Sequence, residues 1–345
     1  PFMIKQLFLL AIVLIAAGQA FSQKTIAVQS NGTATFHTDW ASAWAATQAG
    51  DTIYLPGGTF NIGTFIIDKP VAIIGVGHDP TQTHDSLFSF LNGNLYLAEG
   101  SDGSLLHGFS FGALFFHNPN TGSNANIGNI AVSRCRIGNI YIGYSSPSLV
   151  HDILFTENVI NGVSGRNAQN IQFYKNIFES AVSEFNGNVI LANNFFYYGG
   201  SYYAPLTNVY YILAENNIFK TAYYPLRTSE NNLLRNNIFA ANITIDPQTD
   251  LNTWQNNFFN QPLNTVFVNY DEGVFSPTND YHLLPGCVGI GAGSDGYDIG
   301  IYGTAVPYKE GAVPFNPRLV SEQVSTQADE DGNISIQVEV EAQPR

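Results

Sequence analysis

Six copies of nearly the same four-residue phrase lie between residues 157 and 259, and this repeat constrains the fold more than any other feature. The central asparagines of the copies are Asn158, Asn176, Asn194, Asn217, Asn237 and Asn257. Successive copies are 18, 18, 23, 20 and 20 residues apart. A fixed phrase at a short, slightly elastic period is typical of a solenoid, in which each repeat packs on its neighbours.

The residues around each central asparagine alternate in a way that predicts short strands. The positions five and three before it are apolar in the first copies, as in Ile153 and Phe155 or Ile171 and Phe173. Alternate residues of a strand share one face, so these pairs should point into a core. Asn tolerates the left-handed backbone conformation of a corner, and we place that conformation at the asparagine itself. Asparagines stacked about 4.8 Å apart can form a hydrogen-bonded ladder.

The pattern has exceptions and an extension. Asn232 and Asn252 occupy the first inward apolar position of the later copies, which predicts a rearranged turn there. Cys135 stands in the marker position 23 residues before Asn158, as a small buried side chain. A repeat of about 20 residues is too short for two strands and a helix, and the leucine positions of a leucine-rich repeat are missing. The residues therefore favour a parallel β-helix.

Residues 1–22 have the features of a cleavable signal peptide. Lys5 precedes an apolar run over residues 7–17, and Ala20 and Ser22 predict cleavage before Gln23. The apolar run is too short to span a membrane comfortably. We expect a protein without a membrane span, exported to the cell surface, the extracellular space or the periplasm.

The charge of the chain limits its partners. Only 12% of residues are charged, and the formal net charge is −14. This balance argues against nucleic acid and anionic membranes as partners. No cysteine or histidine cluster predicts a metal or another cofactor. His78-Asp79 and His84-Asp85 could ligate a metal, but we interpret them as a solvated turn.

The two ends of the repeat region resemble a known superfamily. Asp39 before Trp40, Ala43 and Trp44 predicts a capped amphipathic helix. The phrase GDTIYLPGGTF (residues 50–60), followed by IIDKPVAIIGVG (residues 66–77), resembles the opening coils of the pectate-lyase-like right-handed parallel β-helices. Residues 280–283 and 295–303 resemble their terminal coil. The resemblance covers about residues 45–305 and implies fold and export, but this superfamily contains lyases, hydrolases, esterases, tailspikes and adhesins.

These observations together predict an all-β chain. We expect one right-handed parallel β-helix of about 10–12 coils over residues 23–305, with an N-terminal capping helix. Residues 306–345 should form a C-terminal tail with one or two short strands, because prolines interrupt the pattern and residues 334–340 alternate.

The sequence lacks the motifs that mark the enzymes of this superfamily. The polygalacturonase phrases, the aspartate cluster of pectate lyases and the pectin methylesterase set do not occur. Glu215 and Arg235 lie 20 residues apart in the outward position two before the marker, so we expect them to touch. Such a pair could act in general acid–base chemistry, with Lys175 and Arg166 as neighbouring cations, or be an ordinary surface ion pair.

Tyrosines crowd the turns between repeats and suggest a ligand. The candidates for stacking on sugar rings are Tyr174, Tyr197, Tyr198, Tyr202, Tyr203, Tyr223 and Tyr224. These rings could equally cover the edges of the coils. Three functions remain open: polysaccharide binding along the lateral face, an atypical polysaccharide lyase or glycoside hydrolase, and a structural or adhesive solenoid.

Overall fold

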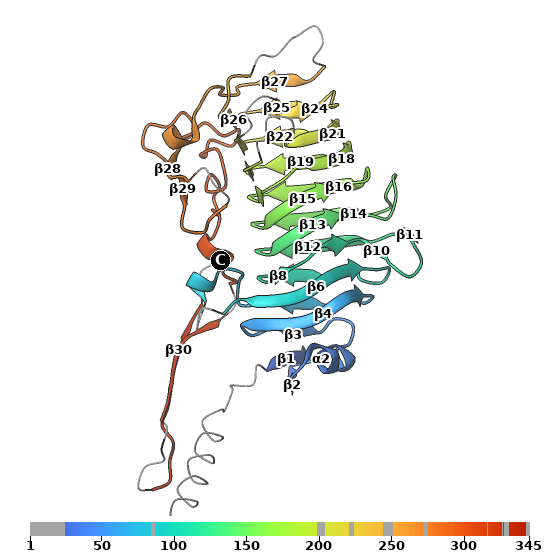
Figure 1. The fold of residues 1–345 in the computed structure, drawn as a ribbon, viewed down its shortest axis with the longest axis vertical. Helices are drawn as coiled ribbons and strands as arrows, with labels where there is room; N and C mark the ends of the chain where they lie inside the picture. The colour runs from blue at the N-terminus through green and yellow to red at the C-terminus, as the bar shows by residue number, and fades with distance from the viewer. Residues whose placement is uncertain are drawn as a thin grey trace, which may run out of the picture.

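A computed structural model describes residues 25–83, 87–198, 204–220, 224–243, 251–271, 275–315, 317–325, 327 and 331–342. The described chain is all-β apart from one α-helix and a few short 3-10 turns. Two long sheets stack their strands along the longest axis of the molecule (Figure 1). The signal peptide predicted for residues 1–22 lies outside the described residues.

The first sheet has twelve strands, and most of them run parallel. Its parallel strands are β3 (Thr52–Tyr54), β5 (Ala72–Ile74), β7 (Leu105–His107), β12 (Gly128–Ser133), β14 (His151–Thr156), β16 (Gln169–Tyr174), β19 (Val189–Ala192), β22 (Leu213–Glu215), β25 (Leu233–Arg235) and β27 (Thr253–Gln255). The antiparallel pair β1 (Ile26–Ser30) and β2 (Thr33–His37) ends this sheet.

The second sheet takes the strands that follow each corner. Along its main path lie β4 (Gly58–Ile67), β6 (Ser89–Leu97), β8 (Ser110–Phe111), β13 (Arg136–Tyr141), β15 (Val159–Ser164), β17 (Ile177–Phe178), β20 (Phe195–Phe196), β23 (Ile218–Phe219) and β26 (Ile238–Phe239). Branching from it are β9 (Leu114–Phe115), β18 (Val182–Asn186), β21 (Leu206–Tyr210) and β24 (Leu226–Arg227). The chain visits the two sheets in turn, which is compatible with a parallel β-helix.

The inward positions predicted from the repeat form the core. Ile153, Phe155, Ile171 and Phe173 are buried. The apolar column two residues after the marker stacks ring on ring at centroid distances of 4.4–5.2 Å, through Phe178, Phe196, Phe219, Phe239 and Phe259. The parallel register aligns equivalent residues of successive repeats, so a single pattern fills the whole interior.

The marker asparagines are hydrogen bonded from one repeat to the next. Asn176 Nδ2 donates to Asn194 Oδ1 at 3.2 Å and to the carbonyl of Phe155 at 2.9 Å. The left-handed conformation, however, belongs to the residue before each marker: φ is 59° at Glu157 and 56° at Lys175. Our prediction that the asparagine itself adopts the left-handed conformation was wrong. The asparagine side chain points into the stack, where it makes the ladder hydrogen bonds, and the side chain of the residue before it points outward.

The later repeats carry a second asparagine contact. Asn232 is buried, and its Nδ2 donates to Asn252 Oδ1 at 2.8 Å and to the carbonyl of Val209 at 2.9 Å. Ile212 N–H donates to Asn232 Oδ1. A polar residue at an inward position is therefore hydrogen bonded within the stack.

The predicted N-terminal helix is confirmed. Helix α2 spans Trp40–Ala46, and the Asp39 carboxylate accepts a hydrogen bond from Ser42 N–H at 2.9 Å. The rings of Trp40 and Trp44 both pack edge-on against Phe65. The helix thus covers the end of the core beside the β1–β2 hairpin (Figure 1).

The chain after residue 260 does not continue the stack as the terminal-coil resemblance implies. Strands β28 (Phe267–Asn269) and β29 (Asp280–Leu283) pair antiparallel with each other alone. Residues 287–315, here called the strap, then run back along the outside of the repeats (Figure 1). Beyond the strap, β30 (Arg318–Val324) and β31 (Ile336–Glu341) form a hairpin, and β10 (His117–Asn118) with β11 (Ser123–Asn124) forms another.

A second apolar core holds the returning chain against the repeats. The column one residue after the marker is apolar and buried: Val159, Ile177, Phe195, Ile218 and Ile238. It packs against Phe267, Tyr281, Ile299 and Tyr308, among others, from the returning chain. Within the described residues, no helix has the length and apolar character needed to cross a bilayer.

Candidate functional site

The strap is fixed to the repeats by the column of left-handed residues that precede the markers. Asn236 Nδ2 donates to the carbonyl of Ala292, and Asn193 Nδ2 to those of Gly300 and Gly303. The strap residue numbers rise as the repeat numbers fall, so the strap runs antiparallel to the direction of stacking. Each outward residue of the column therefore bonds a different part of the strap.

Three charged residues of this column form a buried cluster under the end of the strap. Glu157 accepts from Arg134 Nε and from Lys175 Nζ, both at 2.8 Å, and none of the three is more than 7% exposed. Arg134 donates to the carbonyl of Val313 and stacks on Phe315 at 3.6 Å, and Lys175 donates to the carbonyl of Val306. The cluster uses its charges to hold residues 306–315 in place.

Two of the cations predicted near a catalytic pair lie elsewhere. Lys175 belongs to the buried cluster, so it does not act beside Glu215 as a surface cation. Arg166 lies at the far corner of the second sheet, where it lowers the pKa of His117 together with burial, the larger cause. The structure thus pairs Lys175 with Glu157 and places Arg166 near His117, and a catalytic role of either residue stays a prediction.

The predicted contact between Glu215 and Arg235 is present. Arg235 Nε donates to Glu215 Oε2 at 2.8 Å, and Ser294 of the strap donates to the same oxygen at 2.9 Å. Burial, then Glu215, raises the pKa of Tyr174 two repeats away. The arginine side chain is 38% exposed, so the pair lies at the surface beside the strap and is already satisfied.

The tyrosine candidates fall into different environments. Tyr197 is 6% exposed and donates to the carbonyl of Asp271, so its proposed role as an outward stacking ring is wrong. Tyr174 and Tyr198 are half-buried, and Tyr224 is exposed. Tyr202, Tyr203 and Tyr223 lie outside the described residues.

A polar, ring-lined cavity of about 260 Å³ lies where the strap meets the loop at residues 78–82. Its aromatic lining is Phe275, Tyr281, Tyr302 and Tyr308, its carboxylates are Asp79, Asp280 and Glu310, and its amides are Gln82 and Asn279. Gly311 makes the close approach possible, because φ is +64° there and a Cβ would clash with Gln82. No lysine or arginine is among the described residues that line the cavity.

Asp280 of the cavity lining is paired with an imidazole that lies beside the cavity, His282. Asp280 Oδ1 lies 2.7 Å from His282 Nδ1, and the His282 ring stacks on Tyr302 at 3.7 Å. The pKa of Asp280 is lowered, chiefly because its carboxylate accepts the His282 backbone N–H. Burial raises the pKa of Tyr281 to about 12 and raises that of Tyr302, so both hydroxyls stay protonated and can donate.

The cavity lining also contains a buried histidine whose Nε2 has no hydrogen-bond partner among the described residues. His78 and Asp79 are buried, so our interpretation of them as a solvated turn was wrong. Asp79 accepts from Thr81 N–H at 2.9 Å, whereas His78 Nε2 has no hydrogen-bond partner among the described residues. Burial lowers the pKa of His78 to about 4, so the ring is neutral and can bond a ligand hydroxyl. His84 and Asp85 are outside the described residues.

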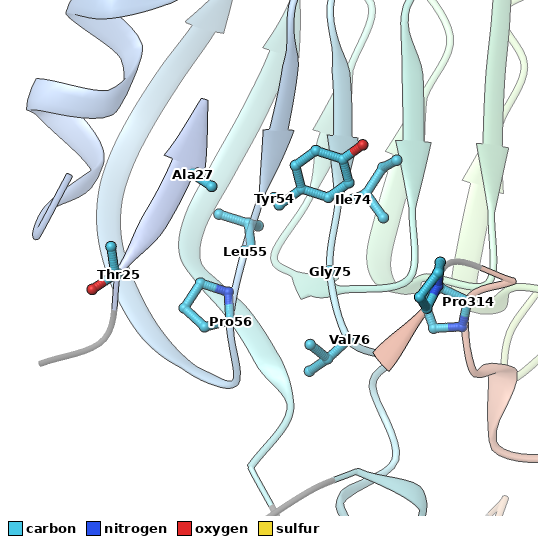
Figure 2. A pocket seen from close by; sticks show the side chains of 10 residues that line it. Thr25, Ala27, Tyr54, Leu55, Pro56, Ile74, Gly75, Val76 and Pro314 are labelled. Carbon is cyan, nitrogen blue, oxygen red and sulfur yellow. The ribbon is translucent and has the colours of Figure 1, made fainter. Parts of the chain in front are cut away.

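A second cavity of about 250 Å³ is less suited to chemistry. Figure 2 shows its walls, which come from the first strands of the stack at Tyr54 and Ile74 and from the strap end at Pro314. Its lining is mainly apolar, and no charged residue is among the described residues that form it. The described chain likewise contains no group of three or more histidine, cysteine, aspartate or glutamate residues placed to hold a metal ion.

Comparison with known proteins adds no family. No protein-family model matches the sequence, and no curated protein matches it significantly.

Proposed function

We propose that this chain is an exported right-handed parallel β-helix protein that binds a neutral glycan, and that the ring-lined cavity at the strap holds one of its sugars. The observation that carries the proposal is the composition of that cavity: tyrosine rings, carboxylates and amides converge on it without a lining cation. Aromatic faces pack against the apolar faces of sugars, while carboxylates and amides bond their hydroxyls.

The charges of the cavity favour a neutral ligand over an acidic one. Asp79, Asp280 and Glu310 would repel the carboxylate of a uronic acid. The guanidinium of Arg136, 5.9 Å from the Phe275 ring, is paired with Glu179. The net charge of −14 also repels acidic ligands over longer distances.

A second candidate function, hydrolysis of the bound glycan, is favoured by the Asp280–His282 pair. Asp280 orients the imidazole through Nδ1, which leaves Nε2 able to accept a proton from water, and Glu310 Oε1 lies 4.0 Å from the same ring. Carboxylates in this cavity could supply the acid that glycosidic cleavage needs. This candidate replaces Glu215 and Arg235 as the place to look for catalysis.

The experiment is a retention and cleavage assay on a panel of neutral and acidic polysaccharides. We expect the purified protein to be retained by at least one neutral glycan, and Glu310→Gln or Gln82→Ala to weaken that retention. New reducing ends that disappear in His282→Gln would support hydrolysis. Glu215→Gln is the matched control, because it removes one carboxylate at the strap outside the cavity.

Two outcomes would contradict the proposal. Retention by acidic glycans alone would exclude the neutral-sugar cavity. No retention and no cleavage by any glycan would favour the structural or adhesive function instead.

A further inference from the structure

A stack of three aromatic rings on the outer face of the second sheet ends abruptly. Tyr96, Phe115 and Tyr141 occupy matching positions on β6, β9 and β13. Their ring centroids are 4.5 and 4.8 Å apart, and the planes are within 9° of parallel. All three side chains are half-buried, so they point out from the sheet with their faces turned along the direction of stacking.

The next position of the same column holds a serine. Ser164 pairs with Tyr141, Ser183 with Ser164, and Thr207 with Ser183. One repeat advances the column by about 4.8 Å, which is also the separation of the stacked rings. A serine in this position is too small to cover the outer face of Tyr141 as a fourth ring would.

The far face of Tyr141 is not covered by another ring or cation. Within the described part of the chain, the Phe115 ring is the one ring that stacks on it, and no lysine or arginine lies over it. Its neighbour Tyr144 packs on His117 instead. This ring face is therefore the apolar end of the stack.

Polar groups lie on the strands beside this end of the stack. Ser164 Oγ donates to Glu184 Oε2 at 2.6 Å, and Glu184 is exposed, so its carboxylate can accept further hydrogen bonds. Asn161 and Asn139, on the same two strands as Ser164 and Tyr141, bond each other at 3.0 Å with their amides exposed. A ligand ring with an apolar face and hydroxyls at its edge can pack on the Tyr141 face and hydrogen-bond these polar groups.

We propose that the Tyr141 ring face at the end of this stack, over Ser164, is a second binding site, which takes one pyranose ring of a neutral glycan. The apolar face of the sugar continues the ring stack on Tyr141, and its hydroxyls bond Glu184 and Ser183. The site shares the ligand class of the proposed function but none of the residues of the cavity, so each can fail without the other.

The test blocks the proposed site with a larger side chain of the protein itself. Ser164→Phe places a fourth ring in the stack, and we expect it to keep the thermal stability of the wild type while lowering affinity for neutral oligosaccharides at least about tenfold. Tyr141→Ala should lower affinity similarly, and Tyr141→Phe should retain it, because the ring face is kept. The probes are gluco-, manno-, galacto- and xylo-oligosaccharides, measured by titration calorimetry, and circular dichroism reports folding.

The cavity variant Glu310→Gln separates the two sites. Loss of binding in Ser164→Phe and Tyr141→Ala with normal binding in Glu310→Gln supports the second site and contradicts the cavity. The reverse pattern overturns the second site and leaves the cavity standing. Wild-type affinity in a folded Ser164→Phe, or no binding by the wild type to any probe, also overturns the second site.

Discussion

At the scale of single residues, the repeat depends on buried amides that bond in both directions. Asn194 Oδ1 accepts from the main-chain N–H and the side-chain Nδ2 of Asn176, while its own Nδ2 donates to the carbonyl of Phe173 and to Asn217 Oδ1. Both neighbours are fully buried, so water cannot replace a lost partner.

Asn194→Ala should therefore be strongly destabilising. It leaves several buried donors and acceptors unpaired, and we expect the free energy of unfolding to fall by about 3 kcal/mol or more. Asn161→Ala is the matched control, because its exposed amide makes one bond to Asn139, and it should lower that energy by less than ~1 kcal/mol. Denaturant unfolding measures both, and equal losses would mean that the ladder is not a principal source of stability.

Buried histidines predict that the fold is sensitive to mild acid. Burial lowers the pKa of both His78 and His107 from 6.5 to about 4, so each ring stays neutral in the folded protein while the unfolded chain binds a proton. The two neutral rings make their full contribution to the free energy of unfolding above pH 6.5. As the pH falls toward 4, this contribution is lost, by ~3 kcal/mol for each ring.

Unfolding free energies at pH 7.5 and 4.5 test this sensitivity. We expect the double variant His78→Gln/His107→Gln to lose less stability between the two pH values than the wild type. His37→Gln, at a half-buried position of β2, should keep the wild-type difference. An unchanged difference in the double variant would assign the acid sensitivity to the carboxylates.

The sequence predicted the inward residues well because a single periodic pattern specifies them. Ile153, Phe155 and the stacked phenylalanines follow directly from alternation within a strand. It misplaced the left-handed residue because Glu157 and Lys175 are not residue types that favour that conformation. The reason for charged residues at these two positions is the strap, which packs on their side chains.

At the scale of elements, the strap supplies Tyr302, Tyr308 and Glu310 to the cavity in which we propose that a sugar binds. Its position there depends on the buried cluster of Arg134, Glu157 and Lys175. Lys309 N–H also points at Glu157 Oε2, at 3.4 Å. The cluster therefore connects the repeat to the cavity wall.

Glu157→Gln should loosen this wall. It removes the negative charge between two buried cations, and we expect a loss of about 3 kcal/mol or more in stability. Amide hydrogen exchange at Tyr308 and Lys309 should accelerate more than exchange at the core residues Phe173 and Leu191. The exposed-pair variant Glu215→Gln should cost less than ~1 kcal/mol. Uniformly faster exchange would show that the cluster stabilises the whole stack and not the strap in particular.

The strap itself could not be predicted from the repeat pattern. Residues 287–315 have no periodicity, and their partners lie as far as 179 positions away in the sequence, as Arg134 and Val313 do. One signal was available: the column before the marker reads Arg134, Glu157, Lys175 and then Asn193, Asn216 and Asn236. Charges of alternating sign followed by asparagines in one column indicate a surface that other parts of the chain cover. Our prediction used the column two residues before the marker, which does not carry this signal.

At the scale of the whole molecule, the structure combines a regular scaffold with one irregular covering. The two sheets supply a rigid stack, and the returning chain closes a second core on its outside. Both proposed sugar sites lie where this regularity is interrupted: the cavity at the edge of the strap, and the second site where the ring stack stops at Ser164.

The most direct test of the account is the relative affinity for matched neutral and acidic oligosaccharides, such as galactose and galacturonate oligomers of equal length, measured by titration calorimetry. We predict that the neutral oligomer binds at least about tenfold more tightly, because three carboxylates and no cation line the cavity. The ratio should shrink in Asp280→Asn and Glu310→Gln. Equal or tighter binding of the acidic oligomer would contradict the account.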